Sequence, residues 1–417
     1  MTTRVPYLAL LSLAGCAGLT ARPIAVAPER ALPPLRFTLS GAAVAIYDPA
    51  GEVRIEAGAG PDVVVTVTRA GGDAAALSAL RESRSSGTVL QVLASGPGAH
   101  RLYYPGLPGR SDSVVFRVTA GGLKAGKGGF LGLFAGRATT VVRRPGAGGL
   151  DAHADLLVTV PPGRRLDLQL GAGRLVVTGA AGDIRALTLG GSTQATGSGG
   201  RLRLTAASGG ISVSGASGAL TLESAAGPVE VNGFHGRSLS ATTGAGGVGG
   251  ADLTADTLQV RTGAGDVVLR RVRARRLALR TGAGALRVDD VRADTLLARA
   301  GVGALALRGV RAGAAVIEAR KGDVRLGLLE VPASLRLRAD GAAALALPPG
   351  ADADLALKSD HGRFVIAAPV AGRSGAGQHL FLRLGRGGPR LVVTAEHDLT
   401  VEEETAGATA AAGLRAR

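Results

Sequence analysis

The sequence contains very few of the residues on which many small extracellular and metal-binding folds depend. Its 417 residues include one cysteine, one methionine, seven phenylalanines, four tyrosines and no tryptophan. A single cysteine excludes an internal disulfide framework and a zinc cluster built on several cysteines. Because aromatic residues are scarce, a core has to be built from Leu, Val, Ile and Ala, which favours many thin layers over one thick globule.

Long apolar segments and an acidic balance are also absent. No stretch approaches the roughly 20 apolar residues of a membrane-spanning helix, so we predict no helical span. Lysine and arginine number 48 against 32 aspartate and glutamate residues, which gives a formal net charge of +16. Glycine, by contrast, occurs 66 times and proline 19 times. Together they stay below the roughly 25–30% that signals disorder, so a folded chain is expected.

The first 16 residues have the pattern of an export signal. A short segment with one positive charge, residues 1–4, precedes an apolar run over residues 5–14, which is broken once by Pro6. This length and order are those of a secretory signal peptide rather than of a folded element. We therefore assign residues 1–15 to a signal that is removed from the mature chain.

The residues around Cys16 resemble the lipobox of bacterial lipoproteins. Leu13, Ala14 and Gly15 stand directly before the only cysteine of the chain. The resemblance implies lipidation of the Cys16 thiol and a membrane held through this N-terminal lipid, since each buried methylene contributes about 0.8 kcal/mol. By the same resemblance, Ala17 favours the outer membrane, with its periplasmic or surface face left open. The alternative is a plain secretory signal with an incidental cysteine.

The rest of the chain divides by pattern into four regions. Residues 16–36 hold four prolines and no periodicity, which is typical of a tether. Period-two alternation then predicts an irregular β region over residues 37–165, with a Gly-rich loop at 121–149. Residues 166–400 carry a repeat, and residues 401–417 form an Ala-rich, flexible tail.

A repeat of 18–19 residues dominates the second half of the chain. Its turn glycines are spaced by 18 residues three times and then by 19 residues five times; they are Gly173, Gly191, Gly209, Gly227, Gly246, Gly265, Gly284, Gly303 and Gly322. Apolar residues keep the same register, for example at Val272, Val291, Val310 and Leu329. Nine positions in one register indicate a repeat architecture.

Each repeat is too short to hold a helix and two strands, and it has no helical period. It reads as apolar-x-apolar, glycine turn, apolar-x-apolar, short turn and apolar, so that alternate residues point inward and stack on their equivalents. This pattern predicts an all-β chain whose main part is a single-chain β-solenoid, or β-helix, with 18–19-residue rungs. Glycine would supply a positive φ at every corner, and rungs about 4.8 Å apart would build an elongated rod.

Three motif matches have structural explanations. Residues 121–127 fit most of a Walker phosphate-binding loop, but Gly128 stands where Ser or Thr must contact magnesium. Residues 244–249 fit a dinucleotide fingerprint but form part of one rung. Residues 359–361 are Ser-Asp-His, yet neighbours on a strand point to opposite faces and cannot converge as a catalytic triad.

Neither a metal site nor a catalytic centre is predicted. The six histidines do not pair on one face of a rung, so no zinc site is indicated, and no cofactor is implied. Carbohydrate-active β-solenoids need clustered carboxylates in a groove, whereas Asp252, Asp266 and Asp323 fall near corners in different registers. We predict that the protein is not an enzyme; an enzyme that acts on polysaccharides is the weaker alternative.

Arginine forms two outward columns of one sign in the repeat. With a period of 19, these are Arg261, Arg280 and Arg299, and Arg273, Arg292 and Arg311, followed one rung later by Glu318 and Glu330. Like charges about 5 Å apart repel by roughly 0.8 kcal/mol per pair in water. One hypothesis is a stripe that binds anions through bidentate guanidinium groups. The alternative is an Arg-rich surface that is solvated and binds nothing.

Two further columns alternate in sign. They are Arg270, Asp289 and Arg308, and Asp256, Arg275 and Asp294. We expect solvated ion-pair ladders along both columns, because opposite charges on one face attract their neighbours in the next rung.

The repeat also resembles a known bacterial family. Residues 166–179 (LDLQLGAGRLVVTG) and later copies such as residues 258–269 (LQVRTGAGDVVL) are similar to the "putative adhesin" family of repeated β-strands, formally a domain of unknown function. Residues 156–163 resemble its usual lead-in strand, and residues 47–56 resemble its first strands. The resemblance covers most of residues 37–400 and implies the repeated-strand fold, with adhesion implied only by analogy.

These observations predict a non-enzymatic, lipid-anchored β-solenoid of the bacterial cell envelope, acting as an adhesin or a binding scaffold. Its candidate partners are the membrane, anionic lipid, acidic polysaccharide or an envelope protein. Nucleic acid is not predicted as a partner, because aromatic stacking residues are scarce and export removes the chain from the cytosol. The alternative is a periplasmic accessory protein that senses the envelope or helps to assemble it.

Overall fold

The described part of the chain consists of β-strands, turns and irregular segments. The computed structural model describes residues 35–70, 84–85, 87–92, 100–107, 113–119, 122–125, 137–144 and 149–403. Among these residues the regular elements are all β-strands, and none forms a helix long and apolar enough to cross a bilayer. The all-β class is therefore confirmed for this part of the chain. The predicted signal and nearly all of the predicted tether and tail lie outside the described residues.

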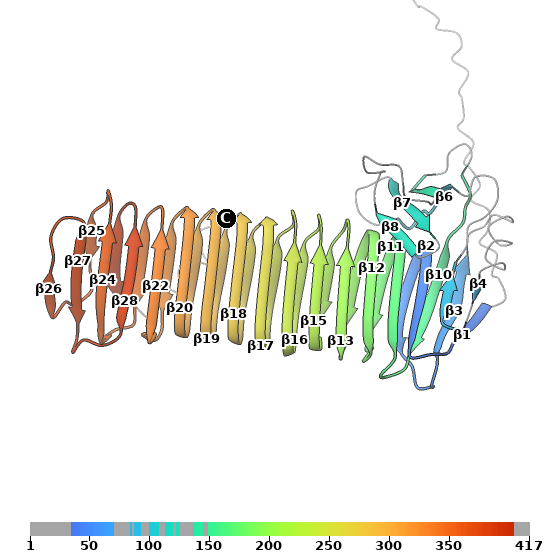
Figure 1. Cartoon of the computed structure of the whole chain (residues 1–417), viewed down its shortest axis with the longest axis horizontal. Coiled ribbons are helices and arrows are strands. Elements are labelled where there is room, and N and C mark those ends of the chain that lie inside the picture. The colour runs from blue at the N-terminus through green and yellow to red at the C-terminus, as the bar shows by residue number, and fades with distance from the viewer. Residues whose placement is uncertain are drawn as a thin grey trace, which may run out of the picture.

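A long rod of stacked rungs makes up most of the molecule (Figure 1). Its regular strands are β11 (Arg165–Thr178), β12 (Asp183–Thr196), β13 (Arg201–Ala206), β14 (Ile211–Ser214), β15 (Ser217–Ser224), β16 (Val229–Thr243), β17 (Val248–Ala264), β18 (Val267–Ala283), β19 (Leu286–Val302), β20 (Leu305–Lys321) and β21 (Val324–Leu328). Equivalent strands of successive rungs pair in parallel. About ten turns with rungs of about 19 residues lie between residues 165 and 346, which confirms the predicted β-solenoid.

Each rung bends three times and therefore has three sides. The ladder from β18 to β19 is interrupted at three points, which are Arg271, Arg275 and Gly282. We call residues 267–270 and their equivalents side A, residues 272–274 side B, and residues 277–281 side C. Inward and outward residues alternate on each side, because successive side chains of a strand point to opposite faces.

Inward side chains stack into apolar columns along the rod. On side A, Val267, Leu286, Leu305 and Val324 are ladder partners, each at most 1% exposed. Because every inward position has an equivalent above and below, each rung buries its apolar face only against its neighbours. The core is thin and needs few aromatic residues.

The prediction that Leu329 points inward was wrong. The side-B column of Val272, Val291 and Val310 continues with Leu328, which is fully buried, and Leu329 is 39% exposed. The ladder between β20 and β21 shifts there, with one residue fewer on β21. The shift moves the inward position from residue 329 to its predecessor.

The turn glycines form a continuous column along the corner between sides C and A. At Gly284 and Gly322 φ is positive, at 147° and 155°, but Gly227, Gly246 and Gly265 are not among the residues with positive φ. The prediction of positive φ at every corner was therefore wrong for these three. A Cβ on any of them would overlap the backbone of the equivalent glycine in the preceding rung. Close backbone approach is thus what requires glycine there.

The first rung comes from the N-terminal region and is followed by a long insertion. β2 (Ala43–Ala57) pairs in parallel with β11 throughout, so that Gly51 is the ladder partner of Gly173. The solenoid thus includes residues 43–57, which corrects the predicted start at residue 166. The 18–19-residue period could not link β2 to the repeat, because more than 100 residues separate them.

Antiparallel strands lie at the N-terminal end of the rod. The strands there are β1 (Leu35–Leu39), β3 (Val63–Ala70), β4 (Arg84–Ser85), β5 (Val89–Gln91) and β10 (Ala154–Val160). β10 pairs in parallel with β2, β3 runs antiparallel to β10, and β1 runs antiparallel to β3. The change of direction ends the parallel stack and covers an edge that another rung would otherwise extend.

A small second sheet lies beside the N-terminal rungs (Figure 1). Its strands, in spatial order, are β6 (Arg101–Tyr103), β9 (Arg137–Val142), β7 (Ser113–Thr119) and β8 (Gly122–Ala125). The loop predicted over residues 121–149 was therefore wrong for β8 and β9. A Cβ on Gly171 would overlap Phe116, and one on Gly190 would overlap Val114. The sheet thus packs directly on the backbone of the glycine corner.

The last rungs do not follow chain order. Their strands are β22 (Ser334–Ala339), β23 (Ala343–Leu347), β24 (Ala353–Ser359), β25 (Phe364–Ile366), β26 (Gly372–Ser374), β27 (His379–Leu384), β28 (Arg390–Ala395) and β29 (Leu399–Glu403). β28 lies between β22 and β24, and β29 lies between β23 and β25. The chain therefore leaves one rung open and fills it later, which corrects the sequential continuation predicted for residues 334–400. Antiparallel β27 and β26 follow β24 at this end.

Candidate anion-binding surfaces

The six arginines singled out in the sequence lie in two columns on different sides of the rod. The side-C column consists of Arg261, Arg280 and Arg299, and the side-B column consists of Arg273, Arg292 and Arg311. Within each column the arginines are ladder partners, as their spacing predicts. The corner at Arg275 separates the columns, so they form two stripes rather than one.

An acidic residue ends each column. In the side-C column, Arg299 Nε lies 2.8 Å from a carboxylate oxygen of Glu318. In the side-B column, Arg311 Nε lies 3.1 Å from one of Glu330. Both glutamates therefore relieve the repulsion at one end of their column, as predicted. Such exposed pairs contribute little to stability, about 0–1 kcal/mol each.

Three of the column arginines that lie away from the two glutamates have no acidic partner in the described structure. Among the residues that the structure describes, no carboxylate lies within 4.0 Å of the guanidinium nitrogens of Arg280, Arg273 or Arg292. All three side chains are exposed. Their donors therefore face solvent, in a geometry suited to bidentate contact with carboxylate or phosphate.

The side-C column runs beside a stripe of apolar residues. Ala278, Leu297 and Val316 are ladder partners in the neighbouring outward column, and all three are partly exposed. Side C therefore offers guanidinium groups and apolar surface next to each other. A ligand with an anionic part and an apolar part could contact both.

The corner between sides A and B holds three residues in a left-handed conformation. Earlier rungs have glycine there, such as Gly233, but Asp252, Arg271 and Asp290 adopt φ of 56°, 53° and 57°. This conformation costs free energy for residues other than glycine, least for Asp. Arg271 forms a bidentate contact with Asp252, at 2.5 and 2.7 Å, which lowers the pKa of Asp252. The ion pair of Arg271 and Asp252 thus borders the side-B column.

The columns predicted to alternate in sign are in register but only partly ion-paired. Arg275 lies 3.5 Å from Asp256. Asp289 is the ladder partner of both Arg270 and Arg308. No ion pair joins Asp289 to either arginine in the described structure, so the expected continuous ladder does not form there.

Sequence reasoning missed a groove on side A. It has a volume of about 380 Å³, and its lining includes Arg287, Asp289, Ala306, Arg308 and Asp323, with Arg325 at the far rung. The sequence contains a signal for this groove: Arg287 and Arg325 are 38 residues apart, and Ala306 lies halfway between them. A small residue between two long ones leaves a hollow once the rungs are stacked.

A buried carboxyl group lies under the small sheet, away from all these surfaces. Asp48 is fully buried, accepts a hydrogen bond of 3.2 Å from the backbone N–H of Ala50, and leaves its second oxygen without a partner. Burial raises the pKa of Asp48 well above its usual value, the Ala50 N–H opposes the rise, and nearby Asp155 adds to it. Burial also raises the pKa of Tyr104. Neither Asp48 nor Tyr104 lines the side-A groove.

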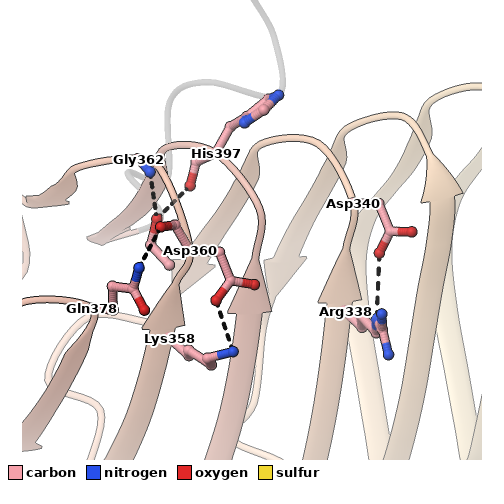
Figure 2. Close-up of polar contacts among 8 residues, drawn as sticks. Arg338, Asp340, Lys358, Asp360, Gly362, Gln378 and His397 are labelled. Atoms are coloured by element: carbon pink, nitrogen blue, oxygen red, sulfur yellow. Dashed lines mark hydrogen bonds and ion pairs between the residues drawn. The ribbon is translucent and has the colours of Figure 1, made fainter.

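The Ser-Asp-His triplet, residues 359–361, begins at the last residue of β24, near the C-terminal end of the rod. Figure 2 shows Asp360 of this triplet beside Lys358. The buried Ser359 hydroxyl donates to the carbonyl oxygen of His397 at 2.8 Å and accepts from the N–H of Gly362 at 2.9 Å. Asp360 pairs with Lys358 at 2.7 Å, and this contact lowers the pKa of Asp360. The serine hydroxyl group therefore hydrogen-bonds to two backbone groups and stabilises the corner that follows β24.

The remaining sequence predictions concern metals and the N-terminus. Within the described ranges, no group of three or more His, Cys, Asp or Glu side chains could hold a metal ion. Cys16 lies outside the described residues, so its lipidation stays a prediction.

Comparison with known proteins identifies the repeat. The family described as Toastrack DUF4097 matches residues 151–372. No curated protein matches the chain. One similar solved structure, a "putative cell adhesion protein" from Clostridium sporogenes, is 7% identical and covers 89% of this chain and 99% of its own, with a TM-score of 0.12. At that TM-score the likeness carries no argument about function.

Proposed function

The chain belongs to the Toastrack DUF4097 family. We propose that it is a non-enzymatic binding scaffold held on the cell envelope by a lipid on Cys16. The rod presents its two arginine columns to a polyanionic ligand, as an adhesin or an envelope scaffold. One observation carries the proposal: like charges are kept in register across three rungs on two sides, although they repel.

The contrast with neighbouring columns supports a binding role. In other columns, charged residues of neighbouring rungs have opposite signs, as in the ion pair of Asp252 and Arg271. The side-B and side-C columns keep one sign instead. A polyanion that bridges several guanidinium groups would offset the repulsion and gain several charge-assisted hydrogen bonds at once.

A charge-matched pair of variants tests the columns. Replacing all six arginines by Gln should abolish retention on immobilised heparin and on vesicles that contain anionic lipid at about 0.15 M salt. The control replaces six exposed arginines outside the columns, which are Arg36, Arg101, Arg237, Arg363, Arg373 and Arg390. Equal retention of both variants would overturn the role of the columns.

The lipid anchor needs its own test. Cys16→Ser should move the full-length precursor's product from the membrane fraction to the soluble fraction, because the sulfur that carries the acyl chains is lost. Ala17→Ser is the control and should stay in the membrane fraction. A Cys16→Ser protein that remains membrane-bound would overturn the anchor.

Protease treatment of intact cells locates the scaffold. Cleavage of the rod supports an adhesin on the surface, because its ligand would then lie outside the cell. Protection in intact cells and cleavage after the outer membrane is opened would favour the periplasmic accessory instead.

A further inference from the structure

The groove on side A is a built feature of three successive rungs. Ala306 on β20 is the ladder partner of Arg287 on β19 and of Arg325 on β21. Arg308 lies two residues further along the same strand, so its side chain leaves the same face of the sheet. Three arginines therefore surround one small residue, and the hollow between them has a volume of about 380 Å³.

Two of these arginines have no polar side-chain partner in the part of the chain that the structure describes. Among the described residues, neither Arg308 nor Arg325 forms an ion pair or a side-chain hydrogen bond, whereas Arg287 lies 3.5 Å from a carboxylate oxygen of Asp266. The guanidinium groups of Arg308 and Arg325 are exposed. They can therefore donate two parallel hydrogen bonds each to a planar carboxylate.

Two carboxylates line the same groove, which sets it apart from the arginine columns. Asp289 makes no ion pair in the described structure, although it stands between two arginines of its own column. Asp323 uses one oxygen to accept a hydrogen bond of 2.9 Å from the N–H of Ala342. Both carboxylates would repel a ligand whose only polar groups are negatively charged. A ligand that also carries hydroxyl groups can donate to them.

The floor of the groove is apolar. It is formed by Ala304 and Ala306 between the charged walls, while the side chain of Leu305, which stands between them in the sequence, points into the core. The C–H face of a sugar ring can lie on such a floor, while its substituents reach the walls. Cationic donors for a carboxylate, carboxylate acceptors for hydroxyl groups and an apolar floor thus occur together within one hollow.

From this combination we infer that the side-A groove binds an acidic sugar, namely a uronic acid unit of a polysaccharide. The sugar carboxylate contacts Arg308 and Arg325, and its ring hydroxyls donate to Asp289 and Asp323. The site lies outside the side-B and side-C columns, so the test of this site is independent of the test of the proposed function.

The test measures binding of trigalacturonic acid to the mature chain by isothermal titration calorimetry. Arg308→Gln and Arg325→Gln should each weaken binding by about 10-fold or more, because each removes charge-assisted hydrogen bonds to the sugar carboxylate. Ala306→Leu should also abolish binding, because it fills the floor without changing any charge. Arg237→Gln, an exposed arginine on an earlier rung, is the control for net charge.

Two further arms separate sugar recognition from simple charge attraction. The methyl ester of the same trisaccharide keeps every hydroxyl but loses the charges, and it should bind at least about 10-fold more weakly. Asp289→Asn removes a negative charge, so charge attraction alone predicts tighter binding. Recognition of the ring hydroxyls predicts weaker binding instead.

Each contrary result overturns the proposal. No measurable binding of trigalacturonic acid by the wild-type chain would do so directly. Equal losses in Arg237→Gln and Arg308→Gln, or tighter binding by Asp289→Asn, would reduce the site to unspecific charge attraction. Binding that survives Ala306→Leu would place the sugar elsewhere.

Loss of heparin retention in the six-arginine variant, with trigalacturonate binding intact, would separate this site from the columns.

Discussion

The hydroxyl group of Thr262 lies inside the rod and donates a hydrogen bond of 2.9 Å to the carbonyl oxygen of Gly246, in the glycine corner of the preceding rung. Thr281 makes the same contact to Gly265 at 3.1 Å. Thr243 also accepts from the N–H of Gly246, at 2.9 Å. A column of buried hydroxyl groups thus stabilises the stacked glycines, in addition to backbone hydrogen bonds such as that from Gly265 N–H to Ala283.

Thr262→Val should lower the free energy of unfolding by about 1 kcal/mol. The substitution keeps the shape of the side chain but removes the donor, so the carbonyl oxygen of Gly246 loses this partner in a part-buried place. Urea unfolding followed by circular dichroism measures the change. Thr257→Val, at an exposed position of the same rung, is the control and should stay within about 0.5 kcal/mol of the wild type.

Gly246→Ala should destabilise the rod by at least about 2–3 kcal/mol, a typical cost of overpacking. The new methyl group would overlap the backbone of Gly227, and backbone in a stacked column cannot move without its neighbours. Gly249→Ala tests the reason, because the nearest atom to its added methyl group is a Glu230 side-chain carbon at 3.7 Å. Equal thermal denaturation midpoints for the two variants would contradict this account of the glycine column.

The periodic part of the fold could be predicted from the sequence because every rung repeats the same contacts. Apolar alternation and turn glycines mark the inward columns and the corner directly. The order of the last rungs could not be predicted in this way. Leu391 has the same local pattern as any inward residue, but it pairs with Leu335, 56 residues earlier, because the chain skips a rung and returns. A local period contains no information about such a return.

The arginine columns could be predicted for the same reason, whereas their separation onto two sides could not. The bend between sides B and C separates them, and the sequence has Arg275 there, with no glycine or proline to mark a turn. The bend between sides A and B depends on a left-handed residue, and the sequence has Arg271 there instead of glycine. A bulky residue in that conformation gives no turn signal. The side-A groove needed the same information, since a hollow depends on which outward columns share a side.

Asp48→Asn should make the protein more stable at pH 7. In the folded state burial raises the pKa of Asp48 above its ordinary value of 3.8. As pH rises above that value, the unfolded chain releases this proton while the folded chain retains it, so stability falls with rising pH. Asn has no proton to lose, and its side-chain oxygen can still accept from the N–H of Ala50. We expect a gain of about 1–3 kcal/mol at pH 7.

The pH dependence separates this effect from a general change in packing. Stability of the wild type and of Asp48→Asn, measured by urea unfolding from pH 3 to 7, should converge near pH 3, where Asp48 is protonated in both states. Asp294→Asn, at an exposed position, is the control and should run parallel to the wild type. A constant difference between Asp48→Asn and the wild type at every pH would show that ionisation of Asp48 is not the cause.

Arg280→Glu should stabilise the rod while weakening its hold on polyanions. Arg280 stands between Arg261 and Arg299, so a reversed charge replaces two repulsions by two attractions, about 1 kcal/mol in total for exposed groups at low salt. At 1 M salt the gain should vanish, because the Debye length falls to about 3 Å. Arg270→Glu is the opposite control: it places a negative charge beside Asp289 and should destabilise the rod. If Arg280→Glu is less stable than the wild type at low salt, the column is not under electrostatic strain. Its single sign would then need no ligand to explain it.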